Sequence, residues 1–114
     1  MNQKLDRITD AIIGAAIAVH RELGPGLLES AYEACFSFEL TDKGLWVERQ
    51  KPLPVTYRGV HLECGYRLDL LVEDEVILEL KAVDKLLPIH DAQVLCYLKL
   101  AQKKVGLLIN FHSM

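Results

Sequence analysis

The chain has 114 residues, of which 51% are hydrophobic and 25% are charged, and its net charge is −3 at pH 7. A chain of this length buries about 65% of its unfolded surface on folding, which is enough for a hydrophobic core. We therefore expect a single domain over residues 1–114. The longest apolar run, residues 11–19, is far shorter than the roughly 20 residues that cross a bilayer, which excludes a membrane-spanning helix.

The cysteines exclude a disulfide framework and a C-x-x-C metal pair, because their number is odd and their spacing is wide: Cys35, Cys64 and Cys96. We expect all three to be reduced and mostly buried. The first residues lack the charged-then-apolar layout of a secretion signal, so we expect a cytoplasmic protein that makes no membrane contact.

Two helices open the predicted fold. A stripe of apolar residues at three- and four-residue steps predicts a helix over residues 4–23. Ile13 and Ile17 widen its apolar surface beyond one stripe, and we therefore expect a second subunit to cover it in a homodimer. Gly24-Pro25-Gly26 ends this helix, and a second helix is predicted over residues 28–43, before Gly44.

Strands follow the helices. Residues 46–50, 53–57 and 60–63 have strand-like composition, and Arg58-Gly59 marks a turn between the last two. Pro52 and Pro54 indicate an edge position or a bulge in the early strands.

Two further strands carry charges among apolar residues. Residues 66–72 and 76–83 alternate apolar and charged positions around the short connection 73–75. A three-residue hairpin loop pairs Val72 with Val76, and this register sets Asp69 opposite Glu79 and Arg67 opposite Lys81. Glu79 and Lys81 share one face of their strand, because residues two apart point the same way.

The facing carboxylates predict a cation site. Like charges directly opposite one another on adjacent strands are destabilising. Ionised groups in an apolar strand also cost several kcal/mol unless they are paired or bind a metal. Two carboxylates and water suit Mg²⁺ better than zinc, since no histidine or cysteine falls at a tetrahedral ligand spacing.

A third helix and a last strand complete the prediction. Pro88 opens a helix over residues 89–104, and residues 105–111 read as a buried strand. A strand, helix and strand in this order form a crossover with a parallel strand pair. The predicted fold is therefore α/β, or α+β with a mixed sheet.

This order of elements, with Asp69 on one strand and Glu79-x-Lys81 on the next, resembles the PD-(D/E)XK nuclease superfamily. Within it, Gly26-Leu-Leu-Glu29-Ser-Ala-Tyr32 resembles the motif of the GxxExxY family of small bacterial proteins. The resemblance covers nearly the whole chain, although Leu68 stands where the superfamily pattern has proline. It implies a restriction-endonuclease-like core of helix, antiparallel strands, helix and strand.

The resemblance also implies a metal-dependent nuclease. On that pattern Asp69 and Glu79 are the principal ligands of Mg²⁺ or Mn²⁺, Glu29 adds a carboxylate, and Lys81 is the catalytic lysine. Gln93 and Tyr97 match the helix motif that supports the site, and their spacing places them on one helix face. The implied substrate is DNA, with RNA as the alternative.

Simpler interpretations stand beside these assignments. Glu29 suits the first turn of any helix. Glu79 and Lys81 also suit a self-contained charge network with Arg67 and Asp69, and Tyr32 and Tyr97 suit core aromatics with hydrogen-bonded hydroxyls. The acidic balance does not favour nucleic acid, but bound divalent ions would add positive charge where phosphate sits. The alternative function is a non-catalytic, oligomeric interaction module with a nuclease fold.

Overall fold

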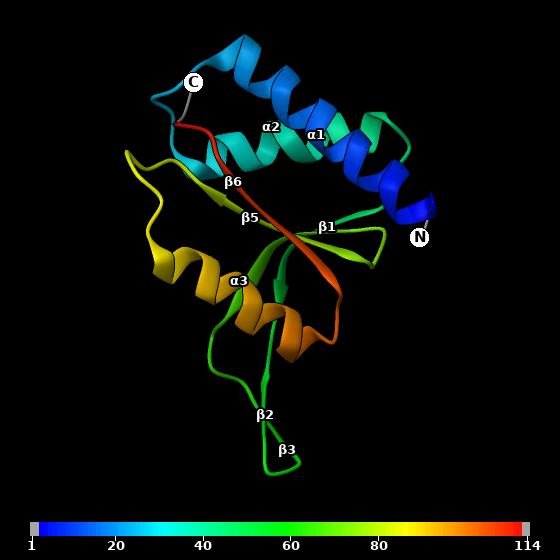
Figure 1. Ribbon diagram of the computed structural model, residues 1–114, viewed down its shortest axis with the longest axis vertical. Coiled ribbons are helices and arrows are strands. Elements are labelled where there is room, and N and C mark those ends of the chain that lie inside the picture. The colour runs from blue at the N-terminus through cyan, green and yellow to red at the C-terminus, as the bar shows by residue number, and fades with distance from the viewer. Residues whose placement is uncertain (1–2, 113–114) are drawn as a thin grey trace.

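The computed structural model describes residues 3–112. Within this range the elements follow the predicted order, with three helices and six strands (Figure 1). Their bounds are α1 (Gln3–Leu23), α2 (Glu29–Asp42), β1 (Val47–Pro52), β2 (Val55–Tyr57), β3 (Val60–Leu62), β4 (Arg67–Val72), β5 (Val76–Lys81), α3 (Pro88–Ala101) and β6 (Val105–Asn110).

Four of the strands form a mixed sheet in the order β1-β4-β5-β6. The pairs β1·β4 and β4·β5 are antiparallel, whereas β5 and β6 are parallel and are connected through α3. Helices α1 and α2 lie on one side of the sheet and α3 lies on the other (Figure 1). The predicted mixed sheet and parallel pair are confirmed, and Pro52 lies on the edge strand β1.

The core has one layer on each side of the sheet. On the α1 and α2 side, Leu70, Val72, Val76, Leu78 and Leu80 pack against the two helices. On the α3 side, the buried residues are Leu53, Leu68, Leu71, Ile77 and Tyr97. Strand β5 is buried from Val76 to Leu80, which explains its nearly continuous apolar sequence.

Helix α3 lies very close to β6 at Gly106. A Cβ atom at this position would lie 2.9 Å from Cγ1 of Val94 and 3.2 Å from Cδ2 of Leu98. The absence of a side chain at Gly106 therefore sets the distance between the last helix and the sheet.

The turn between α1 and α2 explains the glycine-to-tyrosine motif. Gly24 and Gly26 have φ angles of 66° and 111°, which glycine adopts with little strain. The Tyr32 hydroxyl donates to the Gly24 carbonyl and accepts from the Leu27 amide at 3.1 Å. Its ring stacks on Phe111 with centroids 4.7 Å apart. Tyr32 is thus a core aromatic that holds the turn, as its simpler interpretation expects.

Two sequence expectations about burial are wrong. All three cysteines are free, as expected, but they are exposed. The predicted alternation along residues 66–72 also fails, because Leu68 packs on the α3 side while Leu70 packs on the other. The irregularity lies at Asp69, where pairing with β5 has stopped and pairing with β1 skips Gln50, whose φ is 50°.

Strands β2 and β3 form a separate two-stranded sheet, which we call the arm, residues 53–66. The arm projects along the longest axis of the molecule, away from the helices (Figure 1). None of the helices in residues 3–112 has the length and apolar character needed to cross a membrane.

Candidate metal and phosphodiester site

Asp69 on β4 and Glu79 on β5 lie next to each other on neighbouring strands, and we call them the acid pair. The predicted pairing of Val72 with Val76 is confirmed, but the regular ladder ends at Leu70 and Leu78 and so does not include the predicted pairs Asp69–Glu79 and Arg67–Lys81. Beyond this ladder, side-chain carboxylates accept hydrogen bonds from the backbone amides in place of backbone carbonyls. The Leu80 amide donates to Oδ2 of Asp69 at 2.8 Å, and the Asp69 amide donates to Oε2 of Glu79 at 2.9 Å. Each carboxylate is therefore fixed by a backbone amide of the strand opposite.

Glu79 is held in an environment that disfavours its ionised form. Glu79 is buried, with only 4% of its surface exposed. Burial raises the pKa of Glu79 to about 7, and the negative charges of Asp69 and Glu33 raise it further, against the lowering effects of the Asp69 amide and the Lys81 ammonium. A proton or a cation therefore stabilises this carboxylate at neutral pH.

Arg67, which the sequence placed near the carboxylate pair, does not neutralise it. Arg67 forms an ion pair with Glu63 at 3.5 Å instead of reaching Asp69. Within residues 3–112, neither Asp69 nor Glu79 forms an ion pair with lysine or arginine, and Oε1 of Glu79 has no hydrogen-bond partner. The alternative of a closed network joining Arg67, Asp69, Glu79 and Lys81 is therefore wrong. The contacts of the two carboxylates leave them able to bind a cation.

Helix α2 places two glutamates beside the sheet. Glu29, in the first turn of α2, is exposed, and its Oε2 accepts from the Ala82 amide at 3.3 Å, directly after Lys81. Glu33, one turn later, is buried and accepts from Nε and Nη2 of Arg49, both at 3.2 Å. Glu29 thus borders the end of β5, while Glu33 faces β1.

Sequence reasoning missed Glu33 and Gln50. The Gln50 amide donates to Oε1 of Glu33 at 2.6 Å and to Oδ1 of Asp69 at 3.5 Å, so it connects the buried glutamate to the acid pair. The available signal was the i, i+4 spacing of Glu29 and Glu33, which places both on one face of α2. Nothing in the sequence around Gln50 indicates its positive φ.

Gln93 and Tyr97 on α3 lie together, as their spacing predicts. The Gln93 amide donates to the Tyr97 hydroxyl at 3.0 Å, and the Tyr97 ring contacts Tyr66 with centroids 5.9 Å apart. Burial raises the pKa of Tyr97, and the negative charge of Glu79 raises it further. The hydroxyl of Tyr97 therefore lies within electrostatic reach of the acid pair and stays protonated.

The residues of this site fit a cation held by two carboxylates and water. No group of three or more histidine, cysteine, aspartate or glutamate side chains with the arrangement of a metal site occurs between residues 3 and 112. The structure therefore brings together Asp69 and Glu79 but does not gather Glu29 with them as a third ligand. Mg²⁺ commonly binds through one or two carboxylates and keeps several waters, so the pair suffices for that ion.

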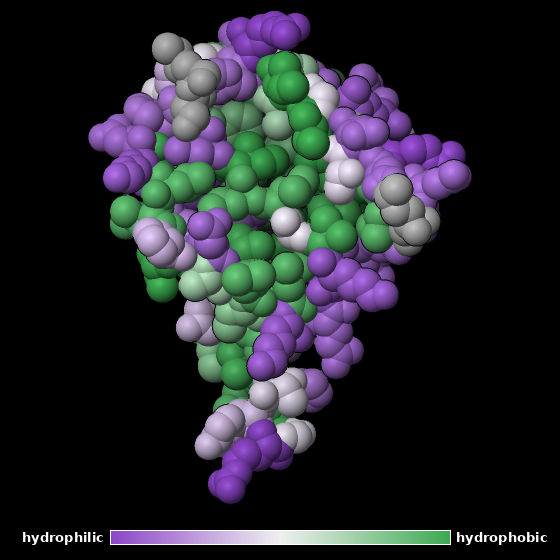
Figure 2. Space-filling view, viewed as in Figure 1, coloured by the Kyte–Doolittle hydropathy of each residue, from purple (hydrophilic) through white to green (hydrophobic). Residues whose placement is uncertain are grey.

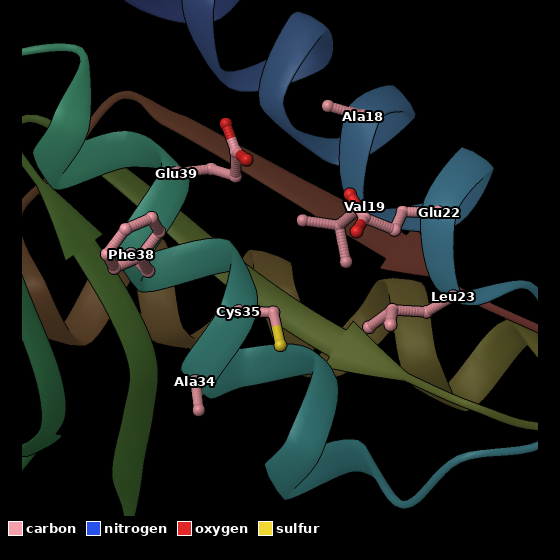
Figure 3. Close-up of a pocket in the computed structure, with 8 residues that line it drawn as sticks. All are labelled: Ala18, Val19, Glu22, Leu23, Ala34, Cys35, Phe38 and Glu39. Carbon is pink, nitrogen blue, oxygen red and sulfur yellow. The ribbon is translucent and has the colours of Figure 1, made fainter.

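An apolar groove lies elsewhere, between α1 and α2. Its volume is about 360 Å³, and Figure 3 shows Val19 and Leu23 of α1 and Cys35 of α2 pointing into the space between the helices. The groove contains Glu22 and Glu39 but lacks the strand carboxylates and Lys81. It is therefore separate from the candidate site.

A comparison with protein families matches residues 6–114 to the PD-(D/E)XK nuclease superfamily. Neither a curated protein nor a solved structure matches the chain significantly. The matched range contains Glu29, Asp69, Glu79, Lys81 and both α3 residues.

Proposed function

Because the chain belongs to the PD-(D/E)XK nuclease superfamily, we propose that it is a Mg²⁺-dependent hydrolase of phosphodiester bonds in DNA, with RNA as the alternative substrate. The observation that carries the proposal is the acid pair Asp69 and Glu79, held face to face without a basic partner among residues 3–112. We further assign the chain to the GxxExxY family, which is supported by the role of Tyr32 in holding the Gly24 to Leu27 turn.

Asp69 and Glu79 are the proposed ligands of Mg²⁺, or of Mn²⁺ in its place. A divalent ion bound there supplies an acidified water and neutralises negative charge on the phosphate. The elevated pKa of Glu79, about 7, supports this assignment, because the cation would offset the repulsion and desolvation that oppose ionisation. Glu29, which is fixed to the Ala82 amide, would act through water at the border of the site.

Lys81 is the proposed catalytic residue. It lies two residues after Glu79 on β5 and therefore points to the same face. Its ammonium acts on the Glu79 carboxylate electrostatically but forms no ion pair within residues 3–112. In this position it can stabilise the negative charge that develops on the phosphoryl oxygens. Gln93 and Tyr97 are proposed to support the site and to contact substrate from α3.

The proposal is tested by measuring metal binding and cleavage separately. Calorimetry with Mg²⁺ or Mn²⁺ should detect binding by the parent and little binding by Asp69→Ala. Lys81→Ala should abolish cleavage of DNA but keep most of the metal affinity, because the lysine is not a ligand. Glu22→Gln, an exposed change on α1 away from the acid pair, is the control. Absence of metal binding by the parent, or full cleavage by Lys81→Ala, would contradict the proposed mechanism.

A second copy of the chain is the proposed partner of α1. Ile13 and Ile17 are 51% and 49% exposed on the outer face of this helix, while Ile8 and Ile12 face the core. Asp10 and Arg21 lie on the same outer stripe and form no ion pair within residues 3–112. In an antiparallel pairing around a two-fold axis between the isoleucines, each Asp10 would face the Arg21 of the other copy. Apolar contact and charge complementarity both support a homodimer.

This face also favours the second candidate function, an oligomeric interaction module without catalysis. Sedimentation should detect a dimer of the parent and a monomer of Ile17→Glu. Asp10→Arg should weaken the dimer, and adding Arg21→Asp to that variant should restore it. A monomeric parent at high concentration would contradict the dimer, and a dimer without metal binding would favour the interaction module over the nuclease.

A further inference from the structure

The arm contains an arginine that the described part of the chain leaves without an acidic partner. The segment from Arg49 to Arg67 holds four basic residues and one acidic residue, so its net charge is +3, while the rest of the chain carries −6. Three of the four basic side chains form ion pairs, those of Arg49, Lys51 and Arg67. Arg58 forms none within residues 3–112, and its guanidinium lies 6.0 Å from the centroid of the Tyr57 ring.

Arg58 occupies the tip of the arm in a conformation that arginine adopts rarely. The turn between β2 and β3 has φ angles of 53° at Arg58 and 79° at Gly59. Asparagine, aspartate and glycine adopt this tight hairpin turn more easily. An arginine at this position is therefore not explained by the turn, and the Tyr57 side chain beside it is 61% exposed.

The arm begins at the candidate site. Its root is closed by the hydrogen bond from the Leu53 amide to the Tyr66 carbonyl, 2.9 Å, and Asp69 lies three residues after Tyr66. Tyr66 also contacts Tyr97, which is near Glu79. From Tyr66 to Val60 the strand spans at most about 20 Å, at about 3.3 Å per residue. While one substrate phosphate lies at the acid pair, the tip of the arm can therefore contact a second phosphate several base pairs away.

The exposed surface of the arm agrees with this arrangement. In Figure 2 the lower end of the molecule, where the arm lies in Figure 1, ends in hydrophilic atoms, whereas hydrophobic atoms gather over the centre. The burial pattern of β3 is fully exposed, and the buried core includes the arm only at its root, through Leu53. The tip of the arm is therefore not required for packing the sheet.

We propose that the arm binds the phosphate backbone of double-stranded DNA beside the cleavage site, with Arg58 at its tip as the phosphate contact. The proposal rests on the nuclease function above. A two-stranded ribbon fits the major groove of a duplex, which is about 12 Å wide. Binding of single strands usually relies on several stacking aromatics, and the tip offers only Tyr57, which already lies beside Arg58.

The test measures binding of a fluorescein-labelled DNA duplex by anisotropy in Mg²⁺, in the full chain carrying Lys81→Ala to prevent cleavage. Adding Arg58→Ala should weaken binding about three- to tenfold and reduce the slope of log Kd against log salt concentration by about one. Arg58→Glu should weaken binding further, and Arg58→Lys should keep most of the slope. Arg7→Ala, which removes the same charge from an exposed position on α1, should leave both quantities near the parent values.

The outcomes separate the arm from the nuclease function. If the parent does not bind duplex DNA, the proposed substrate is wrong and the arm proposal fails with it. If the parent binds and cleaves DNA but Arg58→Ala and Arg58→Glu keep its affinity and salt slope, only the arm proposal is overturned. The same holds if the Arg58 variants bind normally and Val60→Glu instead changes the sedimentation of the protein, because the arm then serves a protein contact. Thermal unfolding of each variant checks that the sheet remains folded.

Discussion

Replacing Glu79 by glutamine tests the central electrostatic claim, which is that the fold favours the neutral form of this side chain. The pKa of Glu79 is about 7 in the folded chain and 4.5 for an ordinary glutamate. The folded chain therefore binds this proton more tightly than the unfolded chain does. Protonation of Glu79 therefore contributes to the stability of the fold. This contribution is fully present below the unfolded pKa of 4.5 and is lost as the pH rises through the folded pKa of about 7.

The size of the effect follows from the shift. Each pKa unit corresponds to about 1.4 kcal/mol, so ionised Glu79 costs about 3 kcal/mol once the pH exceeds 7. Glutamine keeps an oxygen that accepts from the Asp69 amide and carries no charge. Without metal, Glu79→Gln should therefore raise the free energy of unfolding by up to about 3 kcal/mol near pH 8 and change it little below pH 4.5.

The assay is urea unfolding of the parent and Glu79→Gln at both pH values, in a metal chelator. Glu22→Gln, an exposed change on α1, is the matched control and should change stability little at either pH. Added Mg²⁺ should stabilise the parent near pH 8, by about 2.7 kcal/mol at a hundredfold excess over its Kd, and should not stabilise Glu79→Gln. A variant that is less stable than the parent near pH 8 without metal would refute this account of Glu79.

Three further changes test other parts of the fold. Tyr32→Phe should reduce the free energy of unfolding by about 1–3 kcal/mol, because it leaves two backbone groups of the glycine turn without the hydroxyl; urea unfolding measures this. Gly106→Ala should destabilise by about 1–3 kcal/mol, because its Cβ would overlap α3 side chains, and thermal unfolding checks it. Glu33→Ala should lower Mg²⁺ affinity by about tenfold through loss of its contact with Gln50, as calorimetry would measure; unchanged affinity would show that this contact does not position Asp69.

Much of the fold was predictable because local signals and the overall topology agree. The short connection at residues 73–75 determines the register from Val72 and Val76 to Leu70 and Leu78, and Asp69 and Glu79 come together directly beyond it. Pro88 starts α3, and a short connection after this helix leads into β6. The resulting β5·β6 pair is parallel, as predicted. The pairing of Gln93 with Tyr97 needed only helical spacing.

The parts that sequence did not predict depend on tertiary contacts. The contacts of Glu33 and Gln50 arise where α2 crosses β1, and no periodicity in either segment encodes that crossing. The residue type alone suggested that the cysteines are buried, but Cys35 lines the groove between α1 and α2 and Cys64 lies in the loop between β3 and β4, so both are exposed. Leu68 changes side because the strand becomes irregular at Asp69, which a strict two-residue repeat does not anticipate.

The parallel pairing of β5 with β6 has a consequence for the order of folding. Asp69 and Glu79 come together in a hairpin, which forms from nearby residues, whereas β6 and α3 close over it from a part of the chain some distance away in sequence. While the hairpin is open to water, the high dielectric constant of water weakens the repulsion between its two acids, and the electrostatic penalty develops only when the later elements exclude solvent. Docking of α3 is therefore the step that these acids should slow, and a divalent ion captured by the hairpin should accelerate it.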